Sequence, residues 1–85
     1  MLTFEYDGRT VEGQTACEVV AAMSQRKLVP ARSLPRYRRA VVRRAMSAGI
    51  LGIEAKDNST FLRTLCVVGL LAPSDQATYE WVSGN

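Results

Sequence analysis

Apolar and polar residues alternate over residues 2–6, and Asp7-Gly8 separates them from a second short segment, residues 9–12. An Asp-Gly pair between two alternating segments is typical of a β-hairpin with a two-residue turn. Pairing across this turn sets Phe4 opposite Val11, so that one face of the hairpin is apolar and the other is polar. The pattern therefore predicts an N-terminal hairpin with one buried face.

The pattern then changes to helical spacing. Thr15 and Glu18 form a capping box, which opens a helix that we expect to run to about Lys27. Pro30 disfavours helical geometry in the residue before it, which predicts a break at that point. The apolar stripe of this helix consists of Ala16, Val19, Val20 and Met23.

A second helix is predicted from Ser33, as cap, to about Ala48. Pro35 falls in its first turn, where the missing amide has no cost, and Gly49 ends it. The side chains that fall together on its core-facing side are Leu34, Tyr37, Val41 and Ala45.

Residues 50–53 are short and apolar and are compatible with a strand or a bend. Residues 57–60 offer several caps for a third helix, which Gly69 ends. We expect its buried side chains to be Phe61, Leu62, Leu65 and Val68.

The C-terminal segment indicates a second hairpin. Two leucines after Gly69 precede a turn-rich segment, 72–76, and residues 77–82 alternate and are rich in β formers. A helix with Ser74 as cap and Asp75 in its first turn is the alternative. The expected fold is a small single α+β domain over residues 1–85, with an N-terminal hairpin, three helices and a C-terminal hairpin.

Composition agrees with one folded domain and excludes several chemistries. The chain has 85 residues, of which 47% are hydrophobic and 22% are charged, so a second independent core does not fit. It contains no histidine, which removes imidazole from catalysis and metal ligation. Cys17 and Cys66 lie in apolar sequence and are interpreted as small buried hydrophobes, with a disulfide or reactive thiol as the alternative.

The net charge of +3 conceals a strong polarisation. Residues 26–44 hold eight of the eleven lysines and arginines and none of the eight acids. Arginine predominates among them, and its planar donor fork suits phosphate or carboxylate. These cations are Arg26, Lys27, Arg32, Arg36, Arg38, Arg39, Arg43 and Arg44.

Four of these cations are predicted to line one side of the second helix. At about 100° per residue, Arg32, Arg36, Arg39 and Arg43 fall together nearly opposite the apolar side, and we call them the arginine face. Arg38 and Arg44 flank the apolar side. Like charges at this spacing repel one another and no acid is interleaved, which favours an anionic partner.

Residues 57–83 resemble the second half of a winged helix-turn-helix domain: a recognition helix that ends in Gly, an aliphatic strand, a wing loop and a returning aromatic strand. Residues 45–50 resemble the ending of the helix before the turn. The resemblance covers about half of the chain and implies DNA binding. It places the positions that contact bases at Ser59, Thr60, Arg63 and Thr64.

This pattern departs from the family at two places. Residues 49–58 are longer than a tight turn and carry Glu54 and Asp57, and the wing loop has Asp75 and no cation. If the chain docks as a winged helix, the arginine face then lies on the helix before the recognition helix.

We therefore expect a small DNA-binding regulatory protein whose arginine-rich helix contacts phosphates, with duplex DNA favoured over other nucleic acids and a homodimer as one possible form. No catalytic constellation, cofactor or metal site is expected. The longest uncharged apolar stretch, 64–73, is far shorter than the roughly 20 residues of a membrane span. A polar N-terminal segment and few cysteines predict a cytoplasmic protein.

The alternative function is protein binding. A small regulator or inhibitor could dock the same arginines on an acidic or nucleic-acid-binding groove of a larger partner, since arginine is a common anchor at interfaces. Whether polyanions alone are sufficient for binding separates the two functions.

Overall fold

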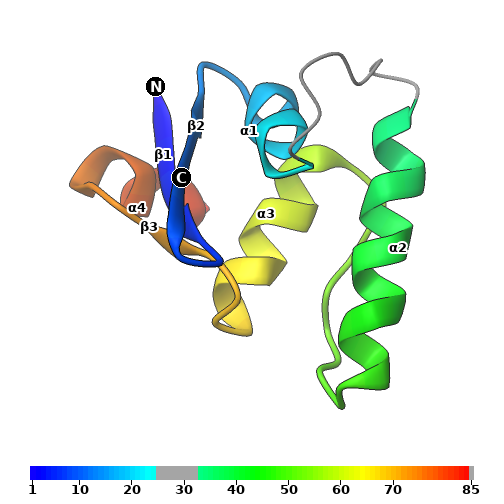
Figure 1. Cartoon of the computed structure of the whole chain (residues 1–85). Helices are drawn as coiled ribbons and strands as arrows, with labels where there is room; N and C mark the ends of the chain where they lie inside the picture. Colours follow the sequence, from blue (N-terminus) through cyan, green and yellow to red (C-terminus); the bar gives the residue numbers. More distant parts are fainter. Residues whose placement is uncertain (25–32, 85) are drawn as a thin grey trace.

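Seven regular elements form within residues 1–24 and 33–84, which are the residues that the structure, a computed structural model, describes (Figure 1). In chain order they are β1 (Leu2–Tyr6), β2 (Arg9–Gly13), α1 (Ala16–Met23), α2 (Leu34–Ser47), α3 (Asn58–Val67), β3 (Ala72–Pro73) and α4 (Gln76–Val82). The described residues thus form a small α+β domain with four helices and three strands.

The N-terminal hairpin is confirmed, including its register. β1 and β2 pair antiparallel with Phe4 opposite Val11, and both side chains are buried. Asp7 and Gly8 have φ angles of 52° and 79°, the left-handed pair that a two-residue hairpin turn requires. The local sequence alone is therefore sufficient to specify this element.

A third strand extends the sheet on the other side of β1, in the order β2-β1-β3. β3 pairs antiparallel with β1, with Pro73 opposite Phe4. The amide of Ser74 then donates to the Thr3 carbonyl at 2.8 Å. These residues belong to the segment that the sequence predicted as a loop.

The predicted C-terminal hairpin is wrong, because residues 76–82 form helix α4. The Asp75 carboxylate accepts from the Thr78 amide at 2.8 Å and caps this helix. The Thr78 hydroxyl is fully buried and accepts from the Thr3 amide at 2.9 Å, which ties α4 to β1. Trp81, one turn further, meets Phe4 edge to face at 6.3 Å. The cap and these contacts with β1 outweigh the β propensity of the segment.

Helices α1 and α3 supply much of the core. Thr15 caps α1 as predicted, and its hydroxyl accepts from the Glu18 amide at 3.2 Å. The helix ends at Met23, and residues 25–27, at the end of the expected extension to Lys27, lie outside the described residues. Asp57 caps α3. The side chains of Phe61, Leu62 and Leu65 are fully buried, whereas that of Val68, also predicted to be buried, is only partly so.

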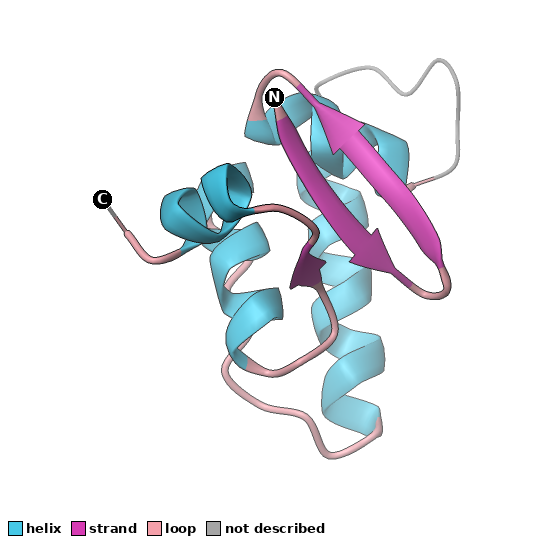
Figure 2. Cartoon of the chain, turned by 90° about the vertical axis from the view of Figure 1, so that its left-hand side faces the viewer, coloured by secondary structure: helices cyan, strands magenta, loops and turns pink. Residues whose placement is uncertain are grey.

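Helix α2 lies beside α3, on the side of the molecule away from the outer face of the hairpin (Figures 1 and 2). The rings of Tyr37 on α2 and Phe61 on α3 meet edge to face at 6.4 Å. Residues 50–55, after α2, form no regular element, so the strand alternative for residues 50–53 is wrong. This arrangement leaves the opposite side of α2 open.

Candidate nucleic-acid interface

Local signals at both ends set the length of α2, the helix that carries most of the described arginines. Pro35 lies in the first turn, and Ser33 occupies the N-cap position, although its hydroxyl makes no capping hydrogen bond. At the other end, Gly49 adopts a φ of 86° and the Ile50 amide donates to the Ala45 carbonyl at 2.9 Å. This is the left-handed glycine ending that the sequence predicted.

Three members of the arginine face, Arg36, Arg39 and Arg43, are exposed. At 100° per residue they lie within about 60° of one another around the helix axis. No acid occurs within α2 to neutralise them. The remaining cations of the predicted site that fall outside the described residues are Arg26, Lys27 and Arg32.

Arg38 is not part of an exposed cationic surface, which corrects its inclusion among the phosphate contacts. Its side chain is only 6% exposed and points into the interior. Its Nε donates to the Ala55 carbonyl at 3.0 Å, and its Nη1 donates to the side-chain oxygen of Asn58. The guanidinium therefore holds α2, the segment before α3, and the start of α3 together.

The Arg63 side chain likewise makes its contacts within the protein. Its Nε and Nη2 donate to the Trp81 carbonyl at 3.2 and 3.1 Å, and its guanidinium lies over the Trp81 ring at 4.3 Å. This contact joins α3 to the end of α4, where sequence reasoning had placed a wing strand. Arg63, which the sequence predicted to contact DNA bases, is thus partly buried against α4.

The other three predicted base-contacting residues are partly buried. The hydroxyl of Thr64 accepts from the Glu54 amide at 3.1 Å and lies 2.9 Å from the Thr60 carbonyl, to which it donates. Ser59 and Thr60 lie in the first turn of α3, next to the capping carboxylate of Asp57. The hydrogen bond from the Thr60 amide to that carboxylate lowers the pKa of Asp57, so a negative charge persists at the carboxylate.

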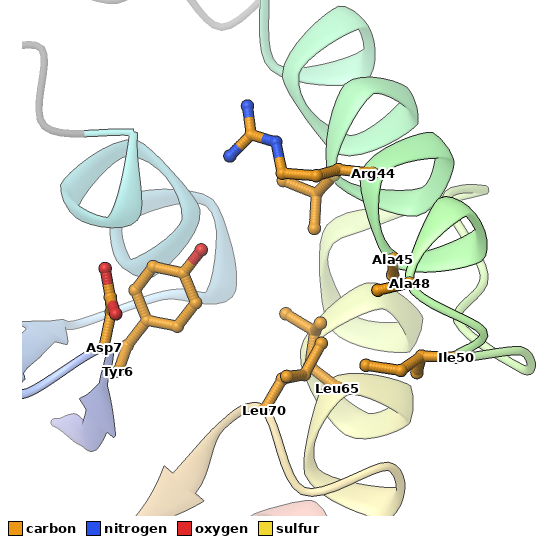
Figure 3. A pocket seen from close by; sticks show the side chains of 9 residues that line it. Tyr6, Asp7, Arg44, Ala45, Ala48, Ile50, Leu65 and Leu70 are labelled. Carbon is orange, nitrogen blue, oxygen red and sulfur yellow. The ribbon is translucent and has the colours of Figure 1, made fainter.

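Arg44 is exposed and lies apart from the arginine face, at the mouth of a pocket of about 310 Å³. Figure 3 shows its side chain extending from α2 toward Tyr6 and Asp7 at the end of the hairpin, across an apolar floor that includes Leu65 and Leu70. Tyr6 and Asp7 are not among the site residues that the sequence predicts. The sequence indicates only a turn at Asp7, and no local signal relates this turn to Arg44.

The phenol of Tyr37 lies next to that of Tyr6. Burial, followed by the neighbouring Tyr6 phenol, raises the pKa of Tyr37, whereas the Arg9 and Arg44 guanidinium groups lower it to a smaller extent. Arg9 itself is held at the end of α1, where it donates to the Met23 carbonyl at 2.8 Å. Two phenols and two guanidinium groups thus gather between the hairpin and α2.

One of the three tyrosines is expected to ionise well above the ordinary pKa of about 10. Because the folded state favours the neutral phenol of Tyr37, unfolding releases a proton in alkali, and stability falls as the pH rises above that value. The measurement is tyrosinate absorbance against pH for the wild type and for Tyr37→Phe. The variant should lack the last phenol to titrate; loss of an earlier one would contradict this placement.

The thiols of both cysteines lie partly within the core. Cys17 and Cys66 are free thiols packed partly against the core, and burial raises the pKa of Cys66 to about 11, which disfavours a thiolate at neutral pH. In residues 1–24 and 33–84, no three acids or cysteines converge as metal ligands would. Nor does any helix in those residues combine the length and apolar content needed to cross a membrane.

Comparison of the chain with protein-family models, with curated proteins and with solved structures finds no match in any of the three.

Proposed function

We propose that this protein binds nucleic acid through phosphate contacts from α2, with duplex DNA as the favoured target. The observation that carries this proposal is the exposure of Arg36, Arg39 and Arg43 on one side of a helix without acids. Guanidinium groups bind phosphate oxygens with two parallel hydrogen bonds and displace counterions from the duplex.

The geometry favours contact with the backbone over base recognition. From Arg36 to Arg43 the arginines extend about 10 Å along the axis, at 1.5 Å per residue, which spans only a few phosphates. Arg63 and Thr64, expected to contact bases in a winged helix, make hydrogen bonds within the protein instead. Phosphate contact by α2 therefore requires no winged-helix docking, and a modest, largely sequence-independent affinity is expected.

Replacing Arg36, Arg39 and Arg43 together by glutamine should weaken binding and flatten its salt dependence. Each lost phosphate contact on duplex DNA reduces the slope of log K against log salt by about 0.9, so the triple variant should lose up to about 2.7. The measurement is fluorescence anisotropy of labelled duplex DNA, single-stranded DNA and structured RNA across a salt series. Because the three side chains are exposed, folding should change little.

Matched controls separate the arginine face from net charge. Arg39→Gln and Lys56→Gln each remove one exposed cation, and only the first belongs to the face. Arg39→Gln should reduce the slope by about 0.9, whereas Lys56→Gln should leave it unchanged. Equal effects of the two variants, or an unchanged slope in the triple variant, would contradict the assignment.

A protein partner is the second candidate, and one observation favours it. Met46 is 54% exposed and follows Arg39 by seven residues, so it lies on the same side of α2. Leu51, just beyond the helix, is 69% exposed. Methionine and arginine are both enriched at protein interfaces. No binding to DNA or RNA even at low salt would reject the first proposal and favour an acidic protein surface.

A further inference from the structure

The pocket beside Arg44 has the form of a small-molecule site. Its volume of about 310 Å³ is at the lower end of the range of about 300–1,000 Å³ for ligand sites. Three parts of the chain line this open pocket: the end of the hairpin, the last turns of α2, and the end of α3 with the residues that follow it. The ligand that fits is decided by the side chains on its floor and at its mouth.

The floor and far wall are apolar. Leu65 and Ala45 are buried beneath the pocket, and Ile50 and Leu70, both partly buried, complete its lower wall (Figure 3). Ala48 lies at the edge and is exposed. An apolar group placed here removes this surface from water and needs no polar partner.

The mouth is polar and carries opposite charges. The exposed Arg44 side chain reaches across it toward the Tyr6 phenol, and Asp7 lies beside Tyr6 (Figure 3). Arg44 can bind one carboxylate through two parallel hydrogen bonds, and a phenol can donate a third. The Asp7 carboxylate repels a second negative charge on the ligand, so a monoanion is favoured over a dianion.

We propose that this pocket binds a small monocarboxylate with an apolar tail, whose carboxylate contacts Arg44 and the Tyr6 hydroxyl and whose tail covers Leu65 and Leu70. Arg44 lies on α2 about 100° from Arg43 around the axis, so the pocket and the arginine face are separate surfaces. This binding site is independent of the proposed contact with nucleic acid.

Octanoate is the probe, titrated into the full-length ¹⁵N-labelled protein below its micelle concentration and followed by amide chemical shifts. The expected result is a saturable set of shifts at the residues around the pocket. Octanol has the same chain and no charge, and octylamine has the opposite charge. Each should bind at least about tenfold more weakly than octanoate, because neither forms the charged hydrogen bonds with Arg44.

Adjacent arginines provide the matched variants. Arg44→Gln should weaken octanoate binding about tenfold or more, whereas Arg43→Gln, which removes the same charge one position earlier, should leave it unchanged. Both side chains are exposed, so neither change should affect folding. Conversely, Arg43→Gln should reduce the salt slope for DNA, so failure of one function does not imply failure of the other.

Ala48→Leu tests the apolar part of the site without a charge change. The larger side chain enters the pocket from an exposed position and should abolish octanoate binding while leaving DNA binding intact. The proposal is overturned if octanoate causes no saturable shifts at the pocket, if octanol binds equally well, or if Arg44→Gln and Arg43→Gln behave alike.

Discussion

Phe61→Ala should lower the free energy of unfolding by about 3–5 kcal/mol, the usual cost of truncating a fully buried phenylalanine. Phe61 has no exposed surface, and its ring meets Tyr37 on α2 edge to face. Truncation leaves a cavity between α2 and α3 and removes the aromatic contact. Urea denaturation followed by circular dichroism measures the loss, which is large because a small domain is stable by only about 5–15 kcal/mol.

Val67→Ala is the matched control, because it shortens an apolar side chain on the same helix. Val67 is 83% exposed, so the change should alter stability by no more than about 0.5 kcal/mol. Because alanine is the better helix former at both positions, similar losses in the two variants would show that the burial of Phe61 against α2 does not determine the result. A loss below about 1 kcal/mol for Phe61→Ala would contradict the packing of α2 on α3.

Arg38→Met is expected to destabilise the fold by about 2–4 kcal/mol, since two acceptors lose a charged donor. Methionine retains much of the length and apolar contact of the arginine stem. It leaves the Ala55 carbonyl and the Asn58 side chain, both acceptors for Arg38, without that partner. Thermal and urea denaturation measure the effect.

The adjacent Arg39 provides the comparison for this prediction. Arg39→Gln removes the same charge from an exposed position and should change stability by less than about 0.5 kcal/mol while reducing the salt dependence of DNA binding. Arg38→Met should show the reverse, with lost stability and an unchanged salt slope in conditions where it is folded. If Arg38→Met proved as stable as the wild type, the guanidinium would not join α2 to α3.

Local signals were sufficient for much of the fold. Asp7-Gly8 specifies the hairpin and its register, because a two-residue turn allows only one pairing of its strands. Thr15 begins α1 and Gly49 ends α2 as expected, and Asp57 is the one of the candidate caps at residues 57–60 that begins α3. The exposure of Arg36, Arg39 and Arg43 follows from the period of 3.6 residues, which separates them from the apolar side of α2.

Residue type alone could not distinguish Arg38 from Arg39. They are neighbours in a cationic run, yet one is 6% exposed and the other is on the surface. The difference arises because Ala55 and Asn58, 17 and 20 residues further along, present oxygens to Arg38. Similarly, the end of α4 brings the Trp81 carbonyl and ring to Arg63. A long side chain takes the partners that folding brings near it, and spacing along the chain does not reveal them.

The C-terminal helix and the pocket both depend on contacts between segments that are far apart in the chain. Residues 77–82 have an alternating β-type pattern, but the Asp75 cap and the burial of Thr78 against β1 favour a helix. The pocket joins Tyr6 to Arg44, which are far apart in the chain. Turns, caps and helix faces depend on residues within a few positions of one another, and the amino-acid sequence therefore specifies them directly. Contacts between distant segments depend on how the finished elements pack, and these contacts determine which arginines are free to bind a ligand.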